Sequence, residues 1–261
     1  MVIVGLPAYN EEEALPRLFE RLEELKQKLG EELKVVAVDD GSNDKTGSIL
    51  KDMAKTYPYV VYLKHEKNKG LGNAVKALLE YVCGNSFADE DIFVLMDADN
   101  THNPGLIPLM SNKLKEENLD VVIASRFVKG GKEIGVSCAR KLISRGAMIF
   151  FKVFFPIKNV NDYSCGFRAY NIGYLKEAMR VYNDDLVTAN GFECMAEILV
   201  KFRKINARVA ECPLVLEYNL KKWRSKINIF KTIWGYLRLL KLKTAGKNKI
   251  EISHGIIDRN I

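Results

Sequence analysis

The sequence has few of the residues that build zinc sites or disulfide frameworks. It contains three histidines, which form no cluster, and five cysteines, which are scattered with no Cys-x-x-Cys spacing. Zinc sites need closely spaced Cys and His ligands, and disulfide frameworks need many cysteines in a short chain. These absences exclude both classes of protein, and the cysteine pattern is typical of a reducing, cytoplasmic compartment.

Long apolar runs are also missing. No stretch reaches the roughly 20 consecutive apolar residues that a transmembrane helix requires. Met1 leads directly into an apolar stretch, so we expect no signal peptide. A chain of 261 residues is long enough for one large α/β domain, or for one domain with a short appendage.

Acidic residues are absent from a long segment near the C-terminus. Residues 218–250 contain ten Lys or Arg and no Asp or Glu. The whole chain carries a net charge of +7, whereas outside this segment 30 basic residues face 33 acidic ones, a net charge of −3. The basicity is therefore local. We divide the chain into a main domain, residues 1–218, and a basic amphipathic helix and tail, residues 219–261.

The predicted helix at residues 225–243 has a basic face and an apolar, aromatic face. Such helices lie in the headgroup plane of anionic membranes, where each basic residue contributes about 1 kcal/mol. A helix packed on the main domain is the alternative. We expect no nucleic-acid partner, because the aromatic residues share the apolar face and do not alternate with the basic ones. The apolar face consists of Ile227, Phe230, Ile233, Trp234, Leu237 and Leu240.

Short apolar stretches alternate with amphipathic helical patterns over residues 1–125. Continuous apolar runs are typical of strands buried on both faces. Alternation of such strands with helices predicts an α/β fold with a mostly parallel sheet flanked by helices. The predicted strands are residues 2–6, 33–38, 60–63, 92–96 and 120–125.

Polar turns follow three of these strands, with the sequences Pro7-Ala8-Tyr9-Asn10-Glu11, Asp39-Asp40-Gly41-Ser42 and Asp97-Ala98-Asp99. The carboxyl ends of parallel strands meet at one edge of a sheet, where ligands bind. Helix capping explains any one turn, but three in this order predict a site. Asp97 and Asp99 suit a hard cation, Mg²⁺ or Mn²⁺, which bridges to a diphosphate. Asp39 and Asp40 suit hydrogen bonds from a ribose or a base.

The second half of the chain departs from this alternation. A glycine-rich loop precedes an amphipathic helix near residues 137–155, whose end at 147–155 is apolar except for Lys152. A further helix is predicted at 191–203 and a strand pair around 208–218. The apolar helix end and the basic C-terminal helix both suit a membrane surface.

The three turns, together with Asn68-Lys69-Gly70-Leu71-Gly72-Asn73-Ala74, resemble those of family 2 glycosyltransferases with the GT-A fold. Later segments resemble the polyprenyl-phosphate sugar synthases, such as the dolichol-phosphate mannose synthases. These segments are Ala124-Ser125-Arg126-Phe127, the stretch from Arg140 to Ala147, Ser164-Cys165-Gly166-Phe167-Arg168, and Ser225-Lys226. The resemblance covers about residues 2–240.

The resemblance implies an inverting glycosyltransferase with its catalytic domain in residues 1–218. The donor is a nucleotide sugar of the GDP-mannose or UDP-glucose type, and the acceptor is a polyprenyl or dolichyl phosphate at the cytoplasmic face of a membrane. The implied catalytic residues are Asp99, Arg126 and Arg140, with the metal on Asp97 and Asp99. The implied acceptor-phosphate ligands are Arg126, Arg140 and Lys226. The implied nucleotide-sugar contacts are Pro7, Ala8, Tyr9, Asn10, Glu11, Asp39, Asp40, Asp97, Ala98, Asp99 and Arg126.

Two features depart from that pattern. Thr101 stands where these synthases usually have a metal-binding Gln, so Asn100 or water would supply the further ligand. The cation that usually follows the last strand pair cannot be assigned within residues 219–224. Two alternatives stay open. One is a soluble family 2 transferase that acts on a saccharide hydroxyl and needs a base, for which Asp162 is the nearby acid. The other is an inactive sugar-nucleotide-binding module.

Overall fold

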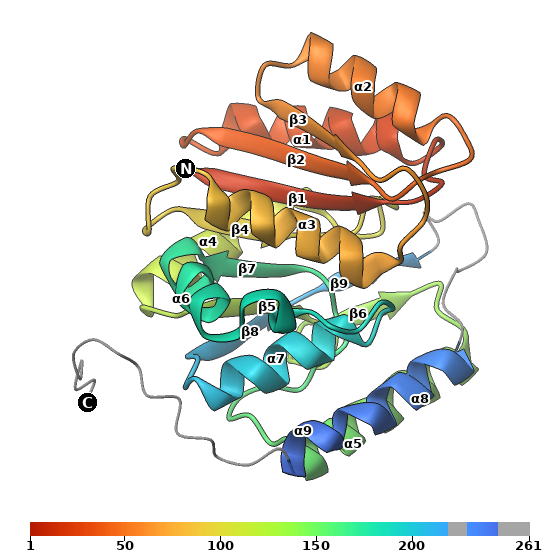
Figure 1. Ribbon diagram of the computed structural model, residues 1–261, viewed down its shortest axis with the longest axis vertical. Helices are drawn as coiled ribbons and strands as arrows, with labels where there is room; N and C mark the ends of the chain where they lie inside the picture. Colours follow the sequence, from red (N-terminus) through yellow and green to blue (C-terminus); the bar gives the residue numbers. More distant parts are fainter. Residues whose placement is uncertain (219–228, 245–261) are drawn as a thin grey trace.

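The computed structural model describes residues 1–218 and 229–244 (Figure 1). A seven-stranded sheet runs through the molecule in the order β3-β2-β1-β4-β7-β5-β8. Its strands are parallel except β7, which is antiparallel to both neighbours. The predicted mostly parallel α/β sheet is therefore confirmed. The strands are β1 (Val2–Ala8), β2 (Leu33–Asp39), β3 (Val60–Lys64), β4 (Ile92–Leu95), β5 (Val121–Ser125), β7 (Arg168–Asn171) and β8 (Val209–Pro213).

Helices cover both faces of the sheet. In Figure 1, α3, α6 and α7 cover the near face, while α1 and α4 lie behind the sheet and α2 lies beside β3. The apolar residues of α1 recur at helical spacing, and Leu15, Leu18, Phe19, Leu22 and Leu25 are all buried. The helices are α1 (Leu15–Lys28), α2 (Thr46–Thr56), α3 (Leu71–Gly84), α4 (Ile107–Glu116), α6 (Ile172–Tyr182) and α7 (Cys194–Lys204), with 3₁₀ turns η1 (Pro104–Leu106) and η2 (Asn183–Leu186).

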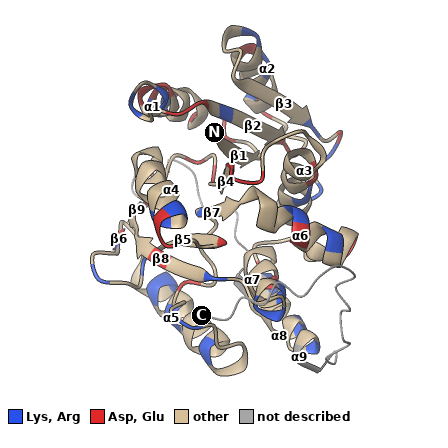
Figure 2. Cartoon of the chain, turned by 90° about the vertical axis from the view of Figure 1, so that its left-hand side faces the viewer, with Lys and Arg blue, Asp and Glu red and all other residues tan. Residues whose placement is uncertain are grey.

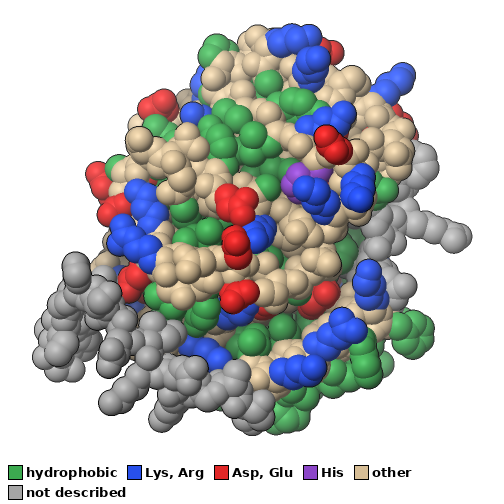
Figure 3. Space-filling model, in the orientation of Figure 1, with side chains coloured by type: hydrophobic (Ala, Val, Ile, Leu, Met, Phe, Trp, Pro, Cys, Tyr) green, Lys and Arg blue, Asp and Glu red, His purple; other side chains and the backbone are tan. Residues whose placement is uncertain are grey.

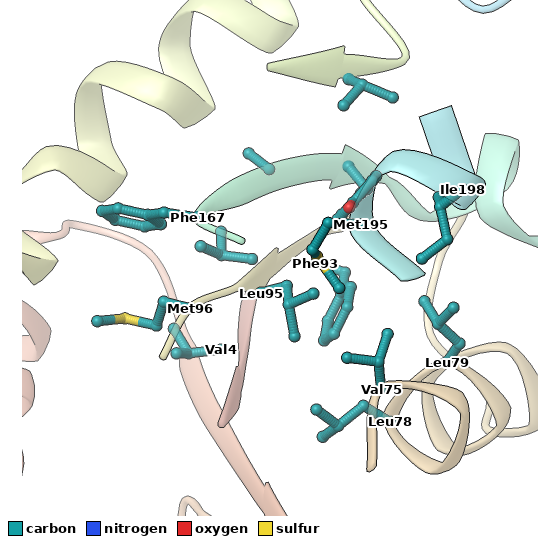
Figure 4. Close-up of a cluster of buried hydrophobic side chains, with 14 of the residues drawn as sticks. Val4, Val75, Leu78, Leu79, Phe93, Leu95, Met96, Phe167, Met195 and Ile198 are labelled. Carbon is teal, nitrogen blue, oxygen red and sulfur yellow. The ribbon is translucent and has the colours of Figure 1, made fainter. Parts of the chain in front are cut away.

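The core centres on Phe93 of β4, which lies between α3 and α7 in Figure 4. Phe93 packs over Gly5 of β1 so closely that a Cβ on Gly5 would lie 2.5 Å from the ring. The glycine thus lets the aromatic ring settle onto the sheet. Val75, Leu78 and Met195 surround the ring and are buried. This packing fixes β1 beside β4, and with it the two turns at their carboxyl ends.

The predicted strand pair near residues 208–218 is wrong, because its two strands belong to different sheets. β8 pairs with β5, whereas β9 (Val215–Glu217) pairs in parallel with β6 (Lys132–Ile134). The chain changes sheets at Leu214, whose backbone N donates to Ser125 O while its carbonyl accepts from Lys132 N. Pro213 precedes this switch and has no backbone N–H for a ladder. The β6–β9 pair forms a separate ribbon beside the main sheet.

Two helices lie together at one end of the molecule, α5 (Cys138–Phe154) and α8 (Ile229–Leu239) (Figure 2). The ring centroids of Phe151 on α5 and Tyr236 on α8 lie 4.9 Å apart. α5 begins directly after Ser137, as predicted, and the predicted C-terminal helix is divided into α8 and α9 (Lys241–Thr244). The start of that predicted helix, with Lys226, lies outside the described residues. In the described part of the chain, every helix is too short or too polar to cross a membrane.

Candidate active site

A cleft of about 580 Å³ opens at the carboxyl ends of the parallel strands. The turns after β1, β2 and β4 form one side, with Pro7, Ala8, Tyr9, Glu11, Asp40, Asp97, Ala98 and Asp99 in its lining. The start of α5 and the inner face of α8 form the other side, with Arg140 and Tyr236 in the lining. The structure therefore brings together most of the residues that the sequence singled out.

Asn10 and Asp39 are in the predicted set but are not part of the cleft lining. Asp39 is buried, and its Oδ1 accepts a hydrogen bond of 2.9 Å from Ser42 N. Asn10 has a φ of 52° and accepts from Asn43 N, which ties the first turn to the second. Both side chains thus shape the turns, and a direct contact of either with the nucleotide stays a prediction.

Asp40 also holds the backbone of the next loop. Its carboxylate accepts hydrogen bonds from Lys69 N at 3.0 Å and Gly70 N at 2.8 Å, and lies 2.6 Å from His65 Nδ1. These contacts set the start of α3 at the edge of the cleft. A buried carboxylate with several donors is a stable acceptor, so Asp40 both lines the cleft and fixes its wall.

The loop before α7 forms a further part of the cleft wall. None of its residues was among the predicted site residues. Gly72 N donates to Asn190 O, and a Cβ on Gly72 would lie 1.7 Å from the Ala189 carbonyl oxygen. Only glycine permits this approach of α3 to the loop. Asn190, with the three residues after it, therefore lines the cleft next to Gly70.

Asp97 and Asp99 both face the cleft, but in different surroundings. The Asp97 side chain is 36% exposed, whereas Asp99 is buried. Asp99 Oδ1 accepts hydrogen bonds from Thr101 N and Thr101 Oγ1, the latter at 2.7 Å. Thr101 therefore orients Asp99. The Asn100 amide oxygen accepts a hydrogen bond of 2.6 Å from Arg21, so in this arrangement it is engaged away from a metal.

His102 supports the same turn, and the sequence prediction missed it because the three histidines are isolated. Its ring is buried and stacks on Phe167 with centroids 5.1 Å apart. Asp97 N lies 3.2 Å from His102 Nδ1, which must accept this hydrogen bond. The neutral ring then carries its proton on Nε2, which lies 3.9 Å from Asp97 Oδ2. His102 thus positions the backbone of Asp97 through Nδ1.

Asp97 and Asp99 fit a divalent cation whose coordination shell is completed by a bound ligand. In residues 1–218 and 229–244, no group of three or more His, Cys, Asp or Glu could hold a metal ion. Asp97 and Asp99 offer carboxylate oxygens only, the ligand type that Mg²⁺ and Mn²⁺ prefer. Mg²⁺ is usually bound by one or two carboxylates together with substrate phosphates and water. The donor set therefore matches a metal bound jointly with a diphosphate.

Arg126 is hydrogen-bonded to a buried acid, Asp162. Its Nε and Nη2 donate to Asp162 at 2.7 Å, and Nη2 also donates to Ser164 at 2.8 Å. Burial would raise the pKa of Asp162, but the charge and hydrogen bonds of Arg126 outweigh burial and lower it. Burial likewise would lower the pKa of Arg126, and Asp162 instead raises it. Asp162 is thus a structural anion, which argues against its use as a base.

Arg140 has a different environment. It donates a hydrogen bond to the Tyr218 hydroxyl, and its guanidinium lies 5.1 Å from the centre of that ring. Among the described side chains, no carboxylate forms an ion pair with Arg140. A guanidinium held by an aromatic ring keeps its positive charge for an anionic ligand. Arg140 is therefore the better placed of the two arginines to bind a phosphate.

Comparison with known proteins decides the family. The model of Glycosyl transferase family 2 matches residues 3–179, which include every turn described above up to Arg126 and Arg140. The chain belongs to glycosyl transferase family 2. Membership of this family favours sugar transfer over an inactive sugar-nucleotide-binding module.

Two curated relatives are similar over most of the chain. Dolichol-phosphate mannosyltransferase of Pyrococcus furiosus is 36% identical over 238 residues, 91% of this chain. The chain spans only 62% of the length of that relative. Undecaprenyl-phosphate mannosyltransferase of Micrococcus luteus is 30% identical over 216 residues, 82% of each protein.

Solved structures of glycosyltransferases share the fold. Glucosyl-3-phosphoglycerate synthase from Mycobacterium tuberculosis, in complex with Mn²⁺, uridine-diphosphate-glucose and phosphoglyceric acid, matches with a TM-score of 0.64 at 17% identity. The match covers 92% of this chain and 80% of that one. TarS residues 1–349 from S. aureus match with a TM-score of 0.57 at 18% identity, over 93% of this chain and 64% of that one. The sheet and its flanking helices therefore form a GT-A fold.

Proposed function

We propose that this glycosyltransferase moves a hexose, most simply mannose, from a nucleotide sugar to a polyprenyl or dolichyl phosphate, with inversion, at a membrane surface. The names of the relatives from P. furiosus and M. luteus support the sugar and the lipid phosphate. The donor is of the GDP-mannose or UDP-glucose type. The structure of the M. tuberculosis enzyme with Mn²⁺ and uridine-diphosphate-glucose supports a metal-dependent nucleotide-sugar donor.

The observation that carries this proposal is the composition of the two cleft walls. The wall with Asp97 and Asp99 belongs to the sheet, and the wall with Arg140 belongs to α5 and α8. The outer surface of α8 exposes large apolar side chains next to Lys and Arg (Figure 3), and α5 also exposes large apolar side chains. A lipid-bound phosphate can therefore reach Arg140 from a membrane on which these helices rest. The exposed apolar residues of these helices that do not line the cleft are Leu142, Ile149, Val153, Phe230, Trp234 and Leu237.

The charges of the cleft suit this reaction. A divalent cation on Asp97 and Asp99 would neutralise the leaving diphosphate. A phosphate acceptor is already an anionic nucleophile and needs no general base, but it must be held close to another anion. Arg140 supplies a cation suited to bidentate phosphate binding. Arg126 and Lys226 stay proposed phosphate ligands, although Asp162 already balances Arg126 and Lys226 lies outside the described residues.

We also propose that the enzyme is peripherally bound at the cytoplasmic face of the membrane. All five cysteines are free thiols, as expected in a reducing compartment. The exposed apolar and basic side chains of α8 provide the two contributions that amphipathic helices use at anionic surfaces. Division of the chain into a catalytic domain at 1–218 and a membrane-binding segment at 219–261 belongs to this proposal.

One observation favours the alternative of a saccharide hydroxyl as the acceptor. The carboxylates near Arg126 reduce the positive potential that a phosphate acceptor would meet. A hydroxyl acceptor needs a general base, and Glu193 is a carboxylate of the cleft lining that could serve. The two acceptors differ in the product that they yield.

One labelling experiment distinguishes a lipid-linked product from a saccharide product. The full chain is incubated with membranes and a panel of labelled GDP- and UDP-sugars, with Mg²⁺ or Mn²⁺, and the lipids are extracted. The proposal predicts that label from one donor enters the lipid fraction only when a divalent cation is present. Label that remains in water-soluble saccharide, with none in lipid, would favour the hydroxyl-acceptor alternative.

A further inference from the structure

Glu133 is a buried carboxylate of the cleft that the reaction as described leaves without a role. Its side chain is 7% exposed and lines the cleft. Its Oε1 atom has no hydrogen-bond partner among the described residues. A carboxylate oxygen removed from water without a donor costs free energy. This oxygen is therefore suited to a ligand that donates a hydrogen bond.

The nearest described cation does not satisfy this oxygen. Arg126 Nη1 lies 3.7 Å from Glu133 Oε1, beyond hydrogen-bond distance, while the other side of the guanidinium binds Asp162. Asp162 already balances the charge of Arg126, so these three side chains together carry a net negative charge. The unpartnered oxygen of Glu133 favours a ligand with hydroxyl donors over a phosphate, which offers only acceptors.

The β6–β9 ribbon links Glu133 to the turn that carries Asp99. Glu133 lies opposite Leu216 in the ribbon. The next residue, Glu217, donates its backbone N–H to Thr101 O, and Thr101 binds Asp99. Glu133 is therefore held beside the diphosphate end of the cleft, on the side that faces Arg126. Between a diphosphate at Asp99 and an acceptor phosphate, the group that must lie there is the sugar.

We propose that Glu133 binds hydroxyl groups of the transferred hexose and thereby selects the donor sugar. This inference rests on the proposed function, because it requires a hexose donor whose diphosphate lies at Asp97 and Asp99. The hexose is neutral and rich in hydroxyl donors, whereas ionised phosphates only accept hydrogen bonds. A site built to bind a hydroxyl strongly rejects an analogue that lacks it.

The test compares intact donors with sugar-free nucleotides. Glu133→Gln and the wild-type chain are titrated calorimetrically with GDP, UDP and the matching hexose donors, including epimers and deoxy analogues, and kcat/KM is measured for each donor. We expect the preferred donor to lose about ten- to a hundredfold in kcat/KM and to bind more weakly, since hydrogen bonds to charged groups are strong. Binding of GDP and UDP should stay within about twofold. A donor that lacks the recognised hydroxyl should lose little, because that interaction is already missing.

Glu211→Gln is the matched control. Glu211 accepts hydrogen bonds from the backbone N–H groups of Asn161 and Asp162, and it is absent from the cleft lining. Its substitution should lower the melting temperature without changing the ratio of kcat/KM values between donors. Glu133→Asp keeps the charge and serves in place of Glu133→Gln if the latter does not fold.

An equal loss with every donor, or weaker binding of GDP or UDP, would overturn the role of Glu133. Because donor binding is measured without an acceptor, the result does not depend on the lipid. If donor selection changes while the product is a saccharide, the acceptor in the proposed function is wrong and the role of Glu133 stands.

Discussion

Arg126 binds Asp162 through two hydrogen bonds of 2.7 Å, from Nε to Oδ2 and from Nη2 to Oδ1. The Asp162 side chain is fully buried and that of Arg126 is 14% exposed. Asp162 also accepts from the backbone N–H of Cys165, which lines the cleft. The pair therefore joins the end of β5 to the loop before β7, and its first role is to shape this side of the cleft.

Removal of Arg126 should destabilise the fold. In Arg126→Met the Asp162 carboxylate loses its counter-charge while it remains buried, which typically costs about 3–5 kcal/mol. Urea denaturation monitored by tryptophan fluorescence measures this loss. Arg140→Met is the control, and it should cost less than about 1 kcal/mol, because Arg140 is paired with a tyrosine and not with a buried charge. Equal effects of the two substitutions would show that the Arg126–Asp162 pair does not support the fold.

The same pair predicts a dependence of stability on pH. Arg126 holds the pKa of Asp162 below its usual value, despite the opposing effect of burial. The pair's contribution is therefore complete above the unfolded-chain pKa, about 3.9, and is lost as the pH falls through the lower folded value. Acid unfolding of Asp162→Asn should show a smaller loss of stability below about pH 4 than the wild type, with both followed by circular dichroism. Parallel curves for the two proteins would contradict this account.

Asp99 should be essential for transfer but not for folding. Asp99→Ala removes a carboxylate of the proposed metal site, and we expect transfer to fall by at least about a hundredfold, a loss typical of removed electrostatic stabilisation. Asp89→Ala is the control, since Asp89 is an exposed acid paired with Lys176 at the other end of β4. Transfer assays in Mn²⁺ or Mg²⁺ buffer, with melting curves, make the comparison. Full activity of folded Asp99→Ala would remove the metal-site hypothesis.

The exposed faces of α5 and α8 should bind anionic vesicles. Phe230 is 86% exposed and Trp234 is 60% exposed. Replacement of both by Ser should weaken cosedimentation with vesicles by at least about tenfold, because each buried apolar side chain contributes about 1.5–3 kcal/mol. Leu109→Ser is the control, since Leu109 is 50% exposed but lies on α4.

Salt separates the two contributions to this binding. At 1 M salt, screening shortens to about 3 Å, so binding should fall only in part if apolar insertion contributes. Complete release by salt, with no effect of the Phe230 and Trp234 substitutions, would favour a surface that does not enter the membrane.

The sequence predicted the sheet and its turns because their residues carry local signals. Continuous apolar strands and polar turns at their ends depend on neighbours along the chain, and Asp97 and Asp99 indeed meet in the cleft. β7 gave no such signal, because it carries Arg168, whose buried guanidinium donates to the carbonyls of Tyr163, Cys165 and Met195. A strand that begins with a buried cation does not resemble a core strand.

The sequence pattern also failed to indicate residues whose positions depend on contacts between distant parts of the chain. Glu133 belongs to a three-residue strand, and its place in the cleft depends on β9, some 80 residues later in the chain. The apolar run 147–155, at the end of α5, contains four phenylalanines with no sign in the sequence of which ones are buried. Phe151 and Phe155 are buried, whereas Phe150 and Phe154 are only partly covered. The exposed face instead carries Ile149 and Val153.

The acceptor is the central claim, and one matched pair of substrates tests it most directly. The full chain is given labelled donor, Mn²⁺ and either a polyprenyl phosphate or the polyprenol of the same chain length, and lipid-linked label is counted. We expect label on the phosphate and less than about one hundredth as much on the alcohol. Arg140→Ala should lower transfer to the phosphate while calorimetric donor binding stays unchanged. Equal labelling of both lipids, or labelling of neither while a saccharide is labelled, would contradict a phosphate acceptor.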